Sequence, residues 1–215
     1  MKFVFETVKE IKQSFRLMMD GAVAQSMRDK GLNYHLNWGA TLPRLQAKAQ
    51  EIKAMFNVSS LMFNVYDLSI ALWKENVREC KILATMLMPP DEILPEVVDI
   101  WQEQIPSQEI AEQLAFNLYQ HLPFAAEKAY QWIASDKEYD QLCGFHVLSR
   151  LFMNGQEPNE RGINEYLDEA LCALQGPYPS VRKAALQSLQ RFAELGILYE
   201  RLAKSATKSI DLDIF

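Results

Sequence analysis

The sequence predicts an all-α protein in which one-sided helices stack in pairs to form an α-solenoid. Three observations predict this fold class. Apolar residues recur at spacings of three and four along most of the chain, and proline and glycine separate these stretches at intervals. No run of alternating apolar and polar residues indicates a strand. The chain therefore consists of helices that each have one face to bury.

The stretch at 72–88, LWKENVRECKILATMLM, shows this pattern most clearly. One apolar stripe comprises Val77, Cys80, Leu83, Ala84, Leu87 and Met88, and a second, just before it, comprises Leu61, Met62, Val65, Leu68, Ala71 and Leu72. We expect the turn between these two helices at Trp73 and Asn76. Two one-sided helices so close in sequence cover each other, and their remaining apolar surface must be covered by the neighbouring pairs.

The first forty residues predict two helices and a loop. A helix at 2–19 ends at Gly21, and a shorter one at 22–30 ends at Gly31. The segment 32–41 has no helical stripe and is the longest irregular stretch. Because binding residues often lie on loops that rigid elements hold, this segment could form a functional lip.

Two capping signals predict the next helices. Thr41 caps a helix at 42–56, with Pro43 near its first turn. Ser59 or Ser60 caps the helix that precedes the stretch at 72–88.

Seven further helices follow the prolines at 89 and 90. Asp91 and Asp136 each cap a helix, Pro179 opens the last long one, and Gly196 precedes a short terminal one. The predicted helices are 91–101, 106–119, 123–134, 136–152, 159–175, 179–192 and 197–204. Roughly twelve helices result, and their starts lie roughly 15 to 20 residues apart, which is the rhythm of HEAT-like repeats. A compact all-α bundle is the alternative.

Composition predicts one soluble domain. The chain has 215 residues, 49% of them hydrophobic, and no linker or low-complexity tract, so we expect a single HEAT-like domain over 1–215. No run of about 18 apolar residues predicts a membrane segment. Cys80, Cys143 and Cys172 are odd in number and lack CxxC spacing, which predicts buried thiols in a reducing, cytoplasmic location.

Charge is distributed unevenly along the chain. Residues 91–170 hold 16 acidic and 4 basic residues, whereas 1–90 and 171–208 each carry a net charge of +4. An acidic centre would repel DNA unless its carboxylates face away from the DNA.

The sequence lacks the usual signatures of metal and cofactor sites. The three histidines are isolated, and no phosphate-binding glycine-rich loop or GxSxG elbow occurs, so we expect no metal and no cofactor. His146, beside Phe145, is expected to pack or to form a hydrogen bond. The four tryptophans lie at expected helix ends or turns, where packing between repeats is the expected role of each (Trp38, Trp73, Trp101 and Trp132).

Several ordered motifs carry a resemblance to a known family. They are the segment 37–45 (NWGATLPRL), Leu72-Trp73 followed by Arg78-Glu79, Trp132-Ile133 before Asp136, and Val181-Arg182-Lys183-Ala184. In this order and spacing the chain resembles the AlkD-type DNA alkylation repair proteins. The resemblance implies a HEAT-like solenoid whose concave face holds duplex DNA. It also implies a glycosylase that releases cationic N3- and N7-alkylated purines.

The resemblance also locates the positions where the family carries its chemistry. Cleavage through an oxocarbenium-like state requires a carboxylate, and a cationic base favours an aromatic wall. The family has an aromatic residue and an Asp one turn apart, then an Arg, then a late Trp. Here Gln108 and Glu112 occupy the first pair, Gln141 (or Leu142) the Arg position and Gln187 the Trp position. Only Glu112 could act as the acid.

Three functional hypotheses remain open. The first is a family member that binds double-stranded DNA, with phosphate contacts from Arg182, Lys183 and Arg191, but has lost the usual excision residues. The second is an interaction scaffold whose acidic centre receives a basic protein. The third is an active glycosylase that uses Glu112, although Glu109 and Glu112 are also typical of a solvated acidic helix face.

Overall fold

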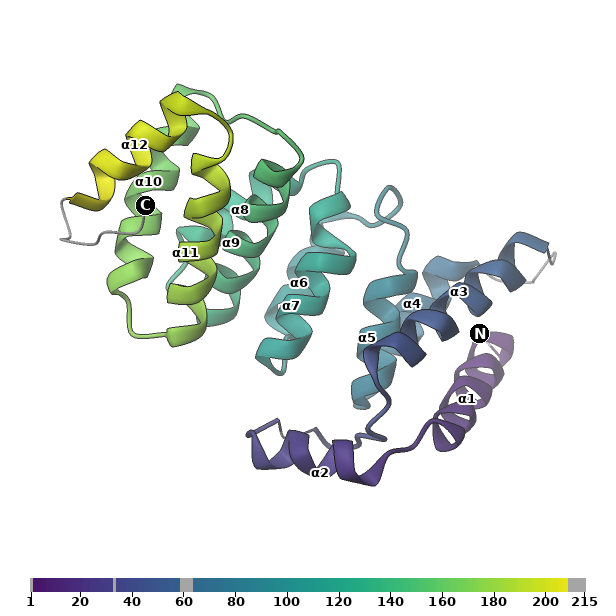
Figure 1. The fold of residues 1–215 in the computed structure, drawn as a ribbon. Helices are drawn as coiled ribbons and strands as arrows, with labels where there is room; N and C mark the ends of the chain where they lie inside the picture. Colours follow the sequence, from purple (N-terminus) through teal and green to yellow (C-terminus); the bar gives the residue numbers. More distant parts are fainter. Residues whose placement is uncertain (1, 33, 59–63, 209–215) are drawn as a thin grey trace. The chain divides into compact units, whose positions relative to one another are not determined.

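The computed structural model describes residues 2–32, 34–58 and 64–208, and within them it contains helices and no strand (Figure 1). The α-helices are α1 (Lys2–Leu17), α2 (Gly21–Asp29), α3 (Leu42–Val58), α4 (Val65–Lys74), α5 (Arg78–Leu87), α6 (Pro95–Glu103), α7 (Gln108–Asn117), α8 (Ala125–Ile133), α9 (Glu138–Met153), α10 (Glu160–Gln175), α11 (Pro179–Ala193) and α12 (Ile197–Thr207). A single 3-10 turn, η1, spans Tyr119–His121. The predicted all-α class is confirmed.

The chain divides into two compact units, 1–100 and 101–215. In the first unit α4 packs against α1 and α5, and α3 packs against α5. The stretch at 72–88 holds the predicted junction of two helices, since α4 ends at Lys74 and Val77 is the N-cap of α5. That the whole chain folds as a single domain stays a prediction.

The irregular stretch 34–41 of the first unit is fixed to the start of α5. One carboxylate oxygen of Glu79, Oε1, accepts the backbone N–H groups of Trp38 at 3.1 Å and Ala40 at 3.2 Å. Arg78 donates to the Ala40 carbonyl at 2.8 Å and lies 3.3 Å from Glu79 Oε1. Both charged side chains are buried, with 1% and 0% exposure. This part of the loop is therefore a braced core element, because its hydrogen bonds to the two charged side chains offset part of the cost of burying them.

Gly39 allows this loop to lie directly against the start of α2. Its φ of +73° belongs to the left-handed region, and a Cβ atom there would lie 2.1 Å from the backbone oxygen of Asp20. Only glycine meets both conditions. The residue type at position 39 therefore determines how the loop packs.

Unit 101–215 has two layers of helices. α7, α9 and α11 contact one another in that order, and α8 and α10 form a second layer, with α8 against α9 and α10 against α11 (Figure 1). We call these the α9 layer and the α8–α10 layer. α8 and α9 approach each other closely at Gly144 of α9, where a Cβ would lie 2.7 Å from Ile133 and 2.8 Å from the Ala129 carbonyl oxygen of α8. A cluster of four aromatic rings fills the C-terminal part: Phe152, Tyr166, Phe192 and Tyr199.

The structure corrects three predicted helix boundaries. Gly21 starts α2 and does not end α1, because the Asp20 carboxylate accepts the N–H groups of the first turn of α2. Asp91 lies in a turn, and α6 begins four residues later at Pro95, a residue whose fixed φ suits a first helical position. Asp136 does not cap α9, since the N-cap is Lys137 and its N–H donates to the hydroxyl of Ser135.

The three cysteines differ in their exposure. Cys80 and Cys143 are buried, and burial raises the pKa of the Cys80 thiol to about 12. Cys172 is exposed, contrary to the prediction, because it falls outside the buried stripe of α10. Ser59 and Ser60 lie outside the described residues, and the N-cap of α4 is Asn64.

Candidate nucleic-acid interface

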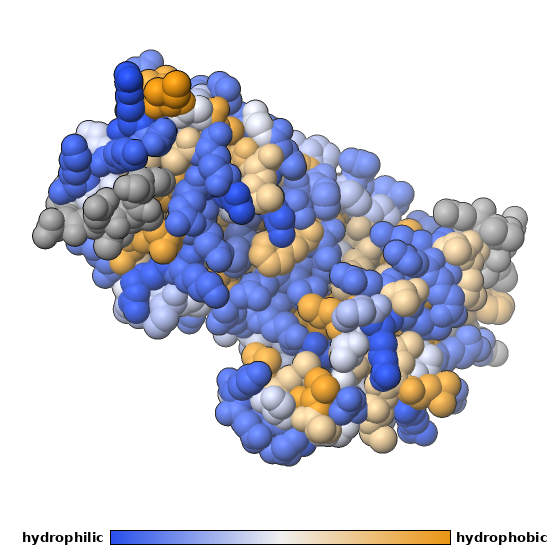
Figure 2. Space-filling model, viewed as in Figure 1, coloured by the Kyte–Doolittle hydropathy of each residue, from blue (hydrophilic) through white to orange (hydrophobic). Residues whose placement is uncertain are grey.

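α9 has a single strip of side chains that reach solvent. α7 and α11 contact it on either flank, and α8 covers a third side. Beyond its first turn, the residues of α9 that are not buried are His146, Ser149, Arg150 and Met153, at spacings of three and four. This strip therefore marks the side of the α9 layer that faces away from α8. In Figure 2 the visible face of this unit is mainly hydrophilic, with hydrophobic residues scattered across it.

Three side chains from two helices meet on this strip. The ring of Phe116, from the last turn of α7, lies 4.9 Å from the ring of His146 in an edge-to-face arrangement at 62°. The guanidinium carbon of Arg150 lies 4.8 Å from the centroid of the same Phe116 ring. Both distances fit favourable aromatic and cation–π contacts, so the ring orients both partners.

His146 is held in its neutral form. Burial, together with the positive charges of Arg150 and Lys183, lowers the pKa of its imidazole to about 4. A partly buried imidazole beside two cations resists taking up a third positive charge. At neutral pH the ring is therefore uncharged and has one N–H donor and one nitrogen acceptor.

The three cations expected to contact phosphate have different surroundings. Arg182 donates to the Gly176 carbonyl at 2.6 Å. Arg191 pairs with Glu194 at 2.6 Å. Lys183 is exposed and has no ion-pair partner in the described part of the chain. Of the three, Lys183 is thus the most available to a ligand, and all three contacts with DNA stay a prediction.

The positions that the resemblance assigns to the family's catalytic residues lie in the α9 layer, and the assignment stays a prediction. Gln108 donates to Glu112 at 2.8 Å along the first two turns of α7, and Phe116 follows one turn later. Gln141 is half-buried in the first turn of α9, and Gln187 is exposed on α11, one turn beyond Lys183. Glu112 is therefore the one carboxylate among these four positions. It already accepts a hydrogen bond from the side-chain amide of Gln108.

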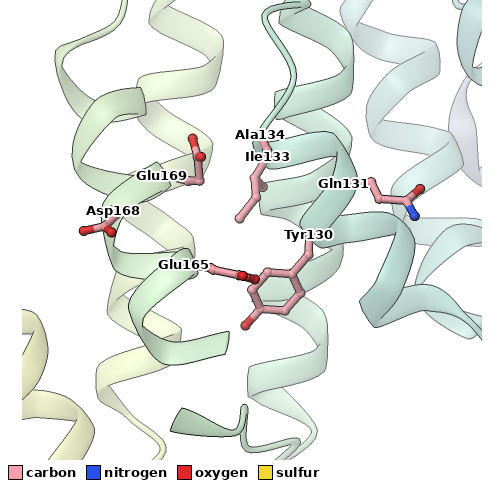
Figure 3. Close-up of a pocket in the computed structure, with 7 residues that line it drawn as sticks. All are labelled: Tyr130, Gln131, Ile133, Ala134, Glu165, Asp168 and Glu169. Carbon is pink, nitrogen blue, oxygen red and sulfur yellow. The ribbon is translucent and has the colours of Figure 1, made fainter. Parts of the chain in front are cut away.

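The α8–α10 layer carries an acidic pocket. It has a volume of about 430 Å³ between α8 and α10 and is lined by Tyr130, Gln131, Ile133, Ala134, Glu165, Asp168 and Glu169. Glu165 extends from α10 towards Tyr130 of α8 (Figure 3), and burial together with Glu165 raises the pKa of the Tyr130 hydroxyl to about 12. Burial and the neighbouring carboxylates also raise the pKa of Glu169. The pocket therefore offers negative charge beside an aromatic ring, which suits a cationic group.

The tryptophans and the two remaining histidines differ in their burial. Trp73, Trp101 and Trp132 are buried, as packing between helices requires, and Trp38 is partly buried with Arg16 5.9 Å from its ring. His35 and His121 are exposed. Among the described residues, no three His, Cys, Asp or Glu side chains gather in a way that could hold a metal ion. No helix of the described residues is long and apolar enough to span a membrane.

Two residues of this cluster, Phe116 and Arg150, were not singled out from the sequence. His146 and Arg150 stand four apart in a predicted helix. That spacing could have indicated a shared face. The meeting with Phe116 could not be foreseen, because it depends on how α7 and α9 pack.

Comparison with known proteins identifies the relatives of this chain. A family model described as "DNA alkylation repair enzyme" matches residues 11–184. A solved structure described as "A new family of proteins related to the HEAT-like repeat DNA glycosylases with affinity for branched DNA structures" is similar, with 16% sequence identity and a TM-score of 0.77. The match covers 93% of this chain and 81% of that chain. No curated protein matches the sequence. The likeness confirms the HEAT-like repeat fold over the compact-bundle alternative.

Proposed function

The chain belongs to the DNA alkylation repair enzyme family, and we propose that it binds DNA through the strip of the α9 layer and has lost the family's usual excision of alkylated purines. The position of two cations on the α9 layer carries this proposal. Arg150 and Lys183 lie on the α9 layer without a carboxylate partner among the described residues, whereas the acidic pocket lies in the α8–α10 layer. A polyanion on the strip would therefore meet positive charge.

The loss of excision follows from the residue types at the family's positions. An oxocarbenium-like transition state needs a carboxylate near the sugar, and a cationic base needs an aromatic wall. Gln108, Gln141 and Gln187 supply neither of these groups. Glu112 already accepts a hydrogen bond from the Gln108 amide at 2.8 Å.

Fluorescence anisotropy of labelled DNA tests the binding. We expect an unmodified duplex to bind at low salt and to lose affinity steeply as salt is raised, because neutralised phosphates release counterions. Since the similar solved structure is described as having affinity for branched DNA, a three-way junction is titrated beside the duplex, and we expect it to bind as well. Absence of binding to either DNA at low salt would overturn the proposal.

A base-release assay tests the loss of excision separately. Duplex DNA treated with a methylating agent is incubated with the protein, and released purines are measured by chromatography. We expect no release above the spontaneous rate. Release that disappears in Glu112→Gln, while that variant still binds DNA, would instead establish an altered glycosylase with Glu112 as its acid.

The acidic pocket favours a second candidate function, the binding of a basic protein segment at the α8–α10 layer. A lysine-rich peptide is titrated against the wild type and the double variant Asp168→Asn, Glu169→Gln. The control variant is Glu103→Gln, an exposed acid outside the pocket. Binding lost only in the double variant would support a scaffold role. Equal binding by all three proteins would mean that the peptide is attracted by the general charge of the surface and not by the pocket.

A further inference from the structure

We propose that Arg150, Lys183 and His146 form one phosphate-binding subsite on the strip, with Phe116 as the surface that holds Arg150 in position. The proposal rests on the DNA binding proposed above and names the part of the DNA that the strip recognises. The ligand is a backbone phosphate. A cationic alkylated base would be repelled by the same side chains.

Arg150 is positioned before any ligand binds. Its guanidinium lies against the Phe116 ring, and its recorded hydrogen bond goes to the sulfur of Met153 at 3.8 Å, a weak acceptor. No carboxylate of the described residues pairs with it. A stacked guanidinium without an anionic partner keeps N–H groups for a bidentate contact with phosphate, and stacking reduces the side-chain entropy lost on binding.

Lys183 and His146 complete the subsite from two helices. Lys183 lies on α11, which packs against α9, and its charge lowers the pKa of His146, as does the charge of Arg150 on α9. α7 contributes Phe116, and α8 meets α9 at Ala129 and Ile133, which are apolar. The titratable groups that act on His146 from the surrounding helices are therefore cations, and this local excess of positive charge is what an anion would neutralise.

Phosphate binding should change the protonation of His146. A bound phosphate offsets the repulsion from Arg150 and Lys183 and can accept a hydrogen bond from a protonated imidazole. The pKa of His146 should then rise from about 4 towards its ordinary value of 6.5. DNA binding near pH 5.5 would therefore be accompanied by proton uptake at this ring.

The test measures duplex affinity against salt for the wild type, Arg150→Gln, Lys183→Gln, His146→Gln and the control Arg161→Gln. Arg161 is a matched cation of α10, 85% exposed and paired with Glu165 in the other layer. We expect Lys183→Gln to reduce the slope of log affinity against log salt by about 1. We expect Arg150→Gln to weaken binding about tenfold or more. Arg161→Gln should bind like the wild type.

A second readout follows His146 itself. The imidazole resonances are titrated with pH by NMR, with and without a short duplex, and His146→Gln identifies the signal among the three histidines. We expect the duplex to raise the pKa of His146. In addition, the ratio of affinities at pH 5.5 and 7.5 should be larger for the wild type than for His146→Gln.

The outcomes separate this proposal from the proposed function. If the wild type binds DNA and Arg150→Gln and Lys183→Gln bind as tightly with unchanged salt slopes, the subsite is overturned and the DNA-binding function stands. An unchanged pKa of His146 on binding removes this ring from the subsite. If the wild type binds no DNA at low salt, both proposals fail together.

Discussion

The substitution His146→Gln gives a direct test of the electrostatics of the strip without any ligand. His146 has a pKa of about 4 in the folded protein, against 6.5 for an unperturbed histidine. As the pH falls through 6.5, the unfolded chain takes up a proton at this residue and the folded protein does not. The stabilisation is therefore complete above pH 6.5 and is lost as the pH falls towards 4.

This difference in pKa corresponds to about 3 kcal/mol in full, of which about 2 kcal/mol is lost between pH 7.5 and pH 5. Glutamine keeps polar character and some of the contact with Phe116 but cannot titrate. The assay is urea unfolding followed by circular dichroism, on the wild type and His146→Gln, at both pH values.

The quantity compared is the loss of unfolding free energy between the two pH values in each protein, since both share the same carboxylates. We expect the wild type to lose about 2 kcal/mol more than His146→Gln over this range. Equal losses in the two proteins would refute the argument. They would mean that His146 is exposed and titrates normally in the folded protein.

Two further substitutions test the first unit by urea unfolding. Glu79→Gln should cost about 3 kcal/mol, because it leaves the buried Arg78 without its anionic neighbour, while Glu165→Gln, in an exposed pair, should leave the urea midpoint unchanged. A small loss for Glu79→Gln would mean that an uncharged acceptor at this position holds the loop and Arg78 equally well. Gly39→Ala should cost about 3 kcal/mol or more, against about 1 kcal/mol for Gly155→Ala, which has the same positive φ but open space for a Cβ. Equal losses for Gly39→Ala and Gly155→Ala would mean that the loop moves away from Asp20 without loss of stability.

The sequence by itself determined the helical class and most of the elements. Spacings of three and four identified the stripes that the structure buries, such as Leu83 and Ala84 of α5. Pro179 was correctly placed at the first position of α11, since its fixed φ and missing N–H suit only that part of a helix. The aspartate caps were less reliable, because Asp91 and Asp136 have the right chemistry and the neighbouring backbone determines whether it is used.

The ordered motifs also predicted the family. The resemblance assigns the family's chemical positions to Gln108, Glu112, Gln141 and Gln187, and this assignment stays a prediction. Residue types at those positions are a property of the sequence alone. They predict a loss of excision, because an amide cannot replace a carboxylate or an aromatic ring in the reaction.

Only the tertiary structure decided which charges lie together. The sequence showed an acidic centre but could not show that Glu165, Asp168 and Glu169 line a pocket in one layer while Arg150 and Lys183 lie in the other. Periodicity assigns a residue to a face of its own helix, but the neighbour of that face depends on packing between helices distant in sequence. Electrostatic energy depends on distance and burial, so the low pKa of His146 and the unpaired cations of the strip exist only once α7, α9 and α11 are packed.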